Sequence, residues 1–264
     1  MLNSMSKKLT LLLTLSIVTG IGYGILYTSH QTNNSPTKEH ASVTNIKQYL
    51  QTLEDELWQQ LTQQGVSKEK FDELYTRNYP HPTKNPNNEC YFHAHISKKN
   101  RELILVLLKE QAIDSTYIKV EPTTIQSSAA AIRNTLLINQ PLFDALPDNQ
   151  KRAVLRHEMQ HIKYYDSYSI NTLANVLGVK DVYATYEQKN HPLTLMSRFV
   201  ETRADLLSLS SSADAAQDFT AYMEATLAMN YPDHPSHPSD KERLAWGQDI
   251  VAHFEAHPQG ETYA

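Results

Sequence analysis

The stretch NQKRAVLRHEMQHIKYYD, residues 149–166, contains the pattern His-Glu-x-x-His at residues 157–161. Apolar residues recur through this stretch at helical spacing, which indicates a buried amphipathic helix. Two histidines four residues apart project from the same face of a helix, where a single zinc ion can bridge them. The stretch therefore predicts a metal-carrying helix with Asp148 as its N-terminal cap. Its expected core residues are Ala153, Val154 and Ile162.

His157 and His161 are the candidate metal ligands of this helix, and Glu158 lies beside the first of them. A carboxylate in that place can take a proton from water, because a bound zinc ion lowers the pKa of its water to roughly 7. We therefore interpret Glu158 as a general base. The alternative is that two histidines and a glutamate occur on one helix by chance.

A second stretch, SRFVETRAD at residues 197–205, places Glu201 and Asp205 on one helix face. Glu201 would be a third ligand, which leaves one coordination position open, as a catalytic zinc site requires. Asp205 would accept a hydrogen bond from a ligand histidine and fix the orientation of its ring. The alternative is a solvated acidic face that is salt-bridged to Arg198 and Arg203.

These motifs resemble the gluzincin metallopeptidase family that includes HtpX, the CAAX prenyl endopeptidases and the BepA- and LoiP-like enzymes. Residues 154–166 are similar to the family's active-site helix and residues 197–205 to its third-ligand helix. His237-Pro with Arg243 six residues later is similar to the family's His-Pro...Arg element. The resemblance covers about residues 101–250. It implies an α+β, mostly helical, zincin-like domain that hydrolyses peptide bonds with one Zn²⁺ per chain.

The resemblance also implies roles outside the two helices. His237 would donate a hydrogen bond to the developing oxyanion, and Arg243 would hold that segment in place. His234 is the rival for the same role, and an idle surface loop is the alternative for both histidines. Residues 127–131 would form an edge strand that pairs with an extended substrate. Its substrate-binding residues would be Ser128, Ala129 and Ala130. Gln160 replaces the glycine that is common in the active-site helix.

Lys7 and Lys8 precede Leu9–Tyr27, a run without charged residues that is about long enough to cross a bilayer as a helix. No small-x-small cleavage site follows it, which favours a signal anchor over a cleaved signal peptide. The two lysines place the N-terminus in the cytoplasm and the catalytic domain outside it, in a bacterial periplasm. Cleavage would instead give a secreted protein.

The expected organisation is a signal anchor or signal peptide (1–27), a flexible linker (28–44), a helical and irregular region (45–100) and a zinc metallopeptidase domain (101–257). Hydrophobic periodicity predicts helices over residues 46–61, after 67, and over 101–112, 149–166, 171–177, 192–210, 213–230 and after 239. Gly65 is a plausible stop for the first helix. Ser239 and Glu242 form a capping box for the last.

Three short runs predict a small β-sheet, at residues 117–120, 125–132 and 135–138. Arg133-Asn134 lies between the last two runs, where a two-residue hairpin turn would fall. Residues 76–100 are rich in proline and asparagine and look irregular. A second metal site there, built from Cys90, His93 and His95, is the alternative to three loop residues without a role.

The composition of the 264 residues excludes several classes of function. A net charge of -5 without a long Lys/Arg run argues against nucleic acid as a partner. The globular part holds only four glycines, so no glycine-rich nucleotide loop can be built. Cys90 is the only cysteine, which excludes an intrachain disulfide and a cysteine-based zinc cage.

The sequence therefore predicts a zinc metalloendopeptidase whose partners are polypeptide substrates and, through the N-terminal segment, a membrane. Its expected substrates are extracytoplasmic or membrane-associated proteins, including misfolded ones. Two alternatives stay open. One is a non-catalytic, zinc-stabilised binding module, and the other is a zinc hydrolase that acts on a non-peptide substrate.

Overall fold

The computed structural model describes residues 45–78, 82–186 and 188–257. The predicted membrane segment, Leu9–Tyr27, and the predicted linker at 28–44 lie outside the described residues, so both stay predictions. Within the described part of the chain, no helix has the length and apolar character needed to cross a membrane.

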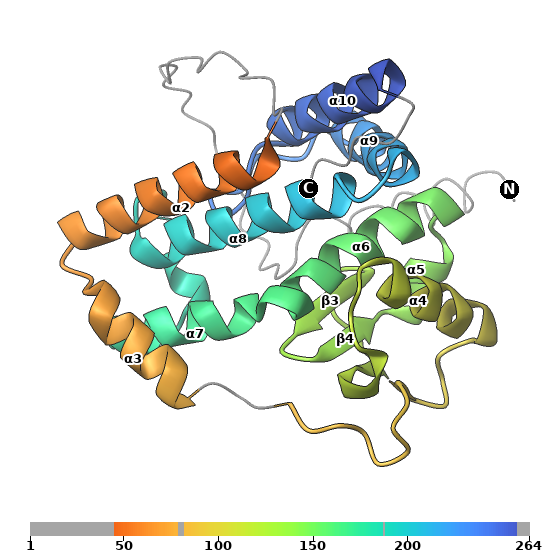
Figure 1. Cartoon of the computed structure of the whole chain (residues 1–264), viewed down its shortest axis with the longest axis horizontal. Coiled ribbons are helices and arrows are strands. Elements are labelled where there is room, and N and C mark those ends of the chain that lie inside the picture. The colour runs from red at the N-terminus through yellow and green to blue at the C-terminus, as the bar shows by residue number, and fades with distance from the viewer. Residues whose placement is uncertain (1–44, 79–81, 187, 258–264) are drawn as a thin grey trace, which may run out of the picture.

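The fold is mostly helical with one small mixed sheet, as the α+β prediction requires (Figure 1). The described α-helices are α2 (Ile46–Gln63), α3 (Lys68–Asn78), α4 (Lys98–Glu110), α5 (Gln140–Asp144), α6 (Asp148–Tyr164), α7 (Asp166–Leu177), α8 (Pro192–Leu209), α9 (Ala213–Ala228) and α10 (Asp240–Ala256). The described strands are β1 (Tyr91–Phe92), β2 (Lys119–Pro122), β3 (Ala129–Ile132) and β4 (Thr135–Ile138). Single 3-10 turns lie at Ser115–Tyr117 and Tyr183–Thr185.

The sheet has the strand order β1-β2-β4-β3, which leaves β3 at one edge. β1, β2 and β4 are parallel neighbours, whereas β3 is antiparallel to β4. Ile132 pairs with Thr135, so Arg133-Asn134 forms the two-residue hairpin turn that the sequence predicts. Arg133 takes a left-handed conformation with φ of 58° there. The two-residue strand β1 was not predicted, because it lies in the segment rich in proline and asparagine.

Helix α6 packs against the sheet and carries the main hydrophobic core. Val120, Leu136 and Ile138 of the central strands are fully buried and meet Leu155 and Met159 of α6. The side chains on this face of the helix are apolar, and burying each of them stabilises the fold by about 1.5–3 kcal/mol. This apolar core therefore holds α6 in place against the sheet.

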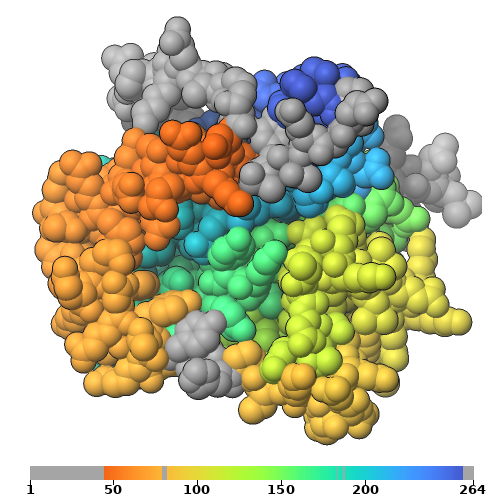
Figure 2. Space-filling view, viewed as in Figure 1, coloured from red at the N-terminus to blue at the C-terminus, as the bar shows by residue number. Residues whose placement is uncertain are grey.

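Helices cover the other side of α6 (Figure 1). α8 and α9 pack on α6, α2 lies along α8, and α10 packs against α9. Two further core clusters hold these helices together, one around Phe219 and Trp246 and one around Leu61 and Leu193. In Figure 2 the orange surface of α2 and α3 lies on one side of the molecule and the yellow and green surface of the sheet layer on the other.

Local predictions at the helix ends were partly wrong. Asp148 is not a cap: Pro147 takes the N-cap position, and Asp148 is the first helical residue, 2.9 Å from the Lys99 ammonium. α7 begins at Asp166 rather than Asn171, directly after Tyr165, whose φ of 54° ends α6. The capping box predicted for the last helix is confirmed. Gly65, with φ of 81°, follows α2 as predicted.

A buried ion network joins α6 to α4 and α9. The Arg156 guanidinium lies 2.6 Å from Asp218 on α9 and 2.7 Å from Glu110 at the end of α4. Arg152, one helical turn earlier, also contacts Asp218 at 2.6 Å. Removing one member of a buried pair leaves an uncompensated charge in the interior, which is strongly destabilising.

Asp218→Ala should therefore lower the free energy of unfolding by about 3–5 kcal/mol, measured by urea unfolding with circular dichroism. Asp72→Ala is the control, because it removes the partner of Lys68 in an exposed ion pair of α3 and should cost less than about 1 kcal/mol. Equal losses in the two variants would contradict a stabilising role for the buried network.

Candidate metal centre

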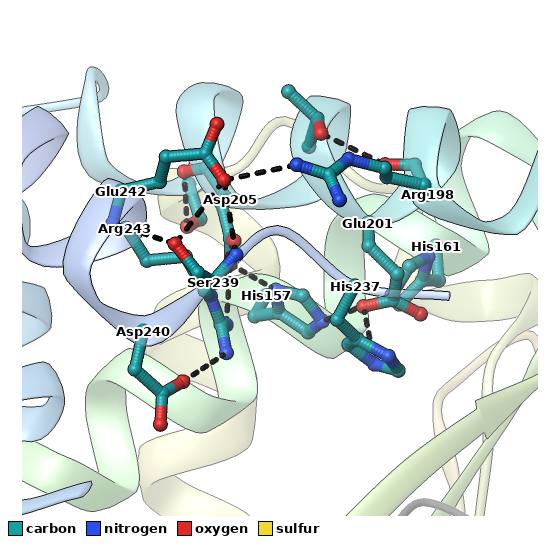
Figure 3. Close-up of polar contacts among 12 residues, drawn as sticks. His157, His161, Arg198, Glu201, Asp205, His237, Ser239, Asp240, Glu242 and Arg243 are labelled. Carbon is teal, nitrogen blue, oxygen red and sulfur yellow. Dashed lines mark hydrogen bonds and ion pairs between the residues drawn. The ribbon is translucent and has the colours of Figure 1, made fainter. Parts of the chain in front are cut away.

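Helices α6 and α8 bring three metal-ligating side chains together (Figure 3). One ligand atom each from His157, His161 and Glu201 lies within 4.8 Å of the other two. The Nε2 atoms of the two histidines are 3.0 Å apart. Glu201 Oε2 lies 3.2 Å from the first and 3.6 Å from the second. In the described part of the chain, no other cluster of histidine, cysteine, aspartate and glutamate has this geometry.

Each ligand histidine is oriented by a buried carboxylate. The Nδ1 atom of His157 is 2.8 Å from Asp205 Oδ1, and that of His161 is 2.8 Å from Asp166 Oδ2. A carboxylate accepts hydrogen bonds, so each Nδ1 carries the proton that it donates. Both Nε2 atoms then turn their lone pairs toward each other and toward the Glu201 carboxylate.

This arrangement fits a cation. Three lone pairs that converge over 3.0–3.6 Å repel one another unless a positive charge lies between them. Burial alone would lower the pKa of His157, but Asp205 and Glu201 raise it to about 9. The negative potential that favours a proton on this imidazole favours a metal ion in the same way. The donor set of two imidazoles and one carboxylate matches that of catalytic zinc sites.

Two arginines hold the two carboxylates. Arg243 binds Asp205 through Nε and a terminal nitrogen, at 2.7 and 2.8 Å. Arg203 binds the other oxygen of Asp166. The role predicted for Arg243 was to hold the His237 segment, whereas its strongest contacts are with Asp205 on α8, and it lies 3.8 Å from Asp240. In both histidine–carboxylate pairs, an arginine guanidinium therefore binds the carboxylate.

Asp166 and Arg203 were missed as site residues. A continuous helix would turn Asp166 away from His161, five residues earlier. The left-handed Tyr165 breaks the helix and brings Asp166 back to the imidazole. One signal in the sequence could have revealed a missing residue. Each of the two ligand histidines needs an acceptor for its Nδ1–H, and Asp205 can serve only one of them.

The salt-bridged acidic face that was the alternative for α8 does not form. Arg198 pairs with Glu242 on α10, and Arg203 pairs with Asp166 on α7. The guanidinium of Arg203 also lies 4.6 Å from the Tyr164 ring and 5.2 Å from the Phe199 ring. Such cation–π contacts fix the direction of the side chain.

Glu158 faces the edge strand from α6. Burial raises the pKa of its carboxyl group, and the two ligand imidazoles and the Ala131 backbone N–H counteract that rise. Glu158 therefore lies between the metal ligands and β3. It also lines the cleft described next.

A cleft of about 860 Å³ runs past this cluster. The edge strand β3 forms one wall with Ala129 and Ala130, and Ser128, which was predicted within the strand, lines the cleft just before β3 begins. The segment that contains His234 and His237 also lines the cleft. A peptide could reach both β3 and the cluster in this space.

The two loop histidines share one hydroxyl group. The buried Ser236 Oγ lies 2.7 Å from His234 Nδ1 and 2.8 Å from His237 Nδ1. His237 Nε2 is 3.3 Å from Glu201 Oε2, which places His237 at the ligand cluster (Figure 3). His234 contacts Ser236, and its ring lies near the rings of Tyr186 and His237.

Cys90, His93 and His95 lie together near β1 but form no metal cluster within the described residues. The two imidazole rings are 4.9 Å apart. Cys90 is partly buried against the core, and this burial raises the pKa of its thiol to about 12. A neutral thiol is a poor metal ligand.

Comparison with curated proteins and with solved structures found no match. A family model does match: residues 126–249 fit the model of peptidase family M48. The matched residues contain β3, α6 with its His-Glu-x-x-His pattern, α8 with Glu201, and the His237–Arg243 segment. Residues 126–249 thus form a domain of peptidase family M48, a family of metallopeptidases.

Proposed function

We propose that the chain is a zinc-dependent endopeptidase that hydrolyses internal peptide bonds of extended polypeptides. The observation that carries the proposal is the convergence of His157, His161 and Glu201 in one cleft with Glu158 and a sheet edge. Zinc held by these three ligands would act as a Lewis acid, which polarises the substrate carbonyl and lowers the pKa of water.

The chain's own residues would then move the protons. Glu158 takes a proton from the attacking water, whose oxygen adds to the carbonyl carbon. The same carboxyl group gives the proton to the leaving nitrogen as the C–N bond breaks. His237 would donate a hydrogen bond to the oxyanion from Nε2, the ring nitrogen that lies 3.3 Å from Glu201 Oε2 at the ligand cluster. Arg243 acts through Asp205, which orients His157.

The edge strand supports a peptide substrate rather than another hydrolysable compound. β3 is antiparallel to β4 on one side and lies at the sheet edge on the other, where an extended peptide can add as a further strand. The small side chains of Ala129 and Ala130 leave room for its approach. Main-chain hydrogen bonds of this kind bind many sequences, as cleavage of unfolded proteins requires.

We expect about one zinc ion per chain, and its loss in His157→Ala, His161→Ala and Glu201→Ala, because each variant removes one of only three protein ligands. Elemental analysis of the purified full-length protein measures it. His95→Ala, which removes an exposed histidine, should retain zinc. Full zinc occupancy in Glu201→Ala would mean that another residue is the third ligand.

Glu158→Gln should keep its zinc and lower the rate of casein cleavage by at least the ~10² to 10⁴ that loss of a general base costs. The amide preserves the size of the side chain but cannot accept the proton of water. Glu224→Gln, an exposed change on α9, is the control and should cleave casein like the wild type. Unchanged cleavage by Glu158→Gln would show that Glu158 is not the general base. A zinc-loaded wild type that cleaves nothing would favour the binding-module alternative.

Arg203→Gln should weaken zinc affinity by roughly 10- to 100-fold, because Asp166 loses the group that holds it against His161. Competition with a chromophoric chelator measures this affinity. The double variant Asp166→Asn/Arg203→Gln should be little weaker than either single variant, because both act through one hydrogen bond. Arg198→Gln is the matched control on the same helix. Additive losses would show that the two residues act independently.

A further inference from the structure

A second cavity, of about 530 Å³, adjoins the catalytic cleft beyond the end of β3. The hairpin turn after β3, helix α7 and the segment that follows α7 form its walls. Asn171, Lys180 and Val182 line both cavities, so the second one continues the first. A chain that occupies the cleft can therefore extend into it.

The charged groups among the described lining of this second cavity are positive. Arg133 and Lys180 are the charged residues among its described lining, and none of the described lining residues is an aspartate or a glutamate. Both side chains are exposed, and neither forms an ion pair with another described residue. Asn171 and Asn175 add neutral amide donors. Two unpaired cations beside amides, in a protein of net charge -5, make this a local site for an anionic group.

The neighbouring carboxylates do not cancel these charges from within the cavity. Asp181 follows Lys180 in the chain but lines only the catalytic cleft. Asp166 also lines that cleft, and Arg203 binds it. The described side chains that line the second cavity thus contribute positive charge only.

The turn that carries Arg133 is held in place. Its backbone N–H donates to Ser167 Oγ on α7 at 2.9 Å, and its φ of 58° belongs to the hairpin turn. The backbone N–H of Ala131 interacts with the catalytic Glu158. Arg133 is two residues further along, in the turn that follows β3, so it lies at most about 7 Å beyond Ala131, the length of two residues in an extended strand. A peptide added to β3 would thus bring a residue two or three positions from the scissile bond to this cavity.

We propose that the cavity between the β3–β4 turn and α7 is a carboxylate-binding subsite of the peptidase, with Arg133 and Lys180 as its cationic residues. The inference rests on the proposed function, because it places the cavity beside a peptide bound along β3. Its ligand is a carboxylate of the substrate, either an Asp or Glu side chain or the C-terminal carboxylate. Arginine suits this chemistry, since its planar donors match a carboxylate in pairs.

Short fluorescein-labelled peptides of alanine and leucine, each with Glu or Gln at one position, test the subsite on the full-length protein. At one position, two or three residues from the cleaved bond, Glu should raise kcat/KM roughly 5- to 50-fold over Gln, the range of a partly exposed charge-assisted contact. This ratio should fall toward 1 in Arg133→Gln/Lys180→Gln and shrink with added salt. Lys119→Gln, an exposed lysine on β2, is the control and should keep it.

A parallel series with free and amidated C-termini separates the two sources of the carboxylate. If amidation abolishes the preference, the subsite binds the C-terminal carboxylate of the substrate. If the preference follows the position of Glu, the subsite binds a carboxylate side chain. The subsite proposal is overturned if wild type cleaves the peptides with neither preference, or if the preference survives in the double variant.

Peptide binding to Glu158→Gln, followed by fluorescence anisotropy, keeps this test independent of turnover. Tighter binding of the Glu or free-carboxylate peptide, lost in the added Arg133→Gln/Lys180→Gln changes, would support the subsite even if wild type cleaved nothing. In that case the proposed function alone would fail. Equal binding of all peptides would overturn the subsite while leaving casein cleavage unaffected.

Discussion

The hydrogen bond from each ligand histidine to a buried carboxylate is the constraint on which the site depends. This bond keeps the ring proton on Nδ1, so Nε2 of His157 and of His161 must face the centre of the cluster. The two carboxylates come from different helices, Asp205 from α8 and Asp166 from the start of α7. Three helices therefore have to be in register before the two imidazoles point correctly. One core holds α6 against the sheet and another holds α7 against α8, and together they provide that register.

The arginines extend the same constraint outward. A buried carboxylate is stable as an anion only beside a positive charge, and Arg243 and Arg203 supply that charge to Asp205 and Asp166. Arg243 lies on α10, so the last helix of the described chain contributes to the orientation of a ligand on α6. The buried pair of Arg156 and Asp218 similarly joins α6 to α9. Polar contacts thus fix α6 laterally, while apolar contacts fix its distance from the sheet.

The sequence was informative where local spacing determines geometry. The patterns around His157 and Glu201 place their side chains through helix periodicity alone, and both helices are where the spacing predicts them. The two-residue turn at Arg133 follows from the alternation on either side of it. Contacts made through a break or between distant elements could not be predicted in this way. This group contains the left-handed conformation of Tyr165, the contact between Arg203 and Asp166, and the contact between Arg243 and Asp205. Each of them depends on tertiary packing.

The break at Tyr165 has a consequence for how folding and metal binding are coupled. A residue other than glycine in the left-handed region costs about 1 kcal/mol or more, and the packing of α6 and α7 around Tyr165 offsets this cost. The ligands are thus preorganised: rotamers of His157 and His161 are already restricted by protein hydrogen bonds, so little conformational entropy is left to lose on binding.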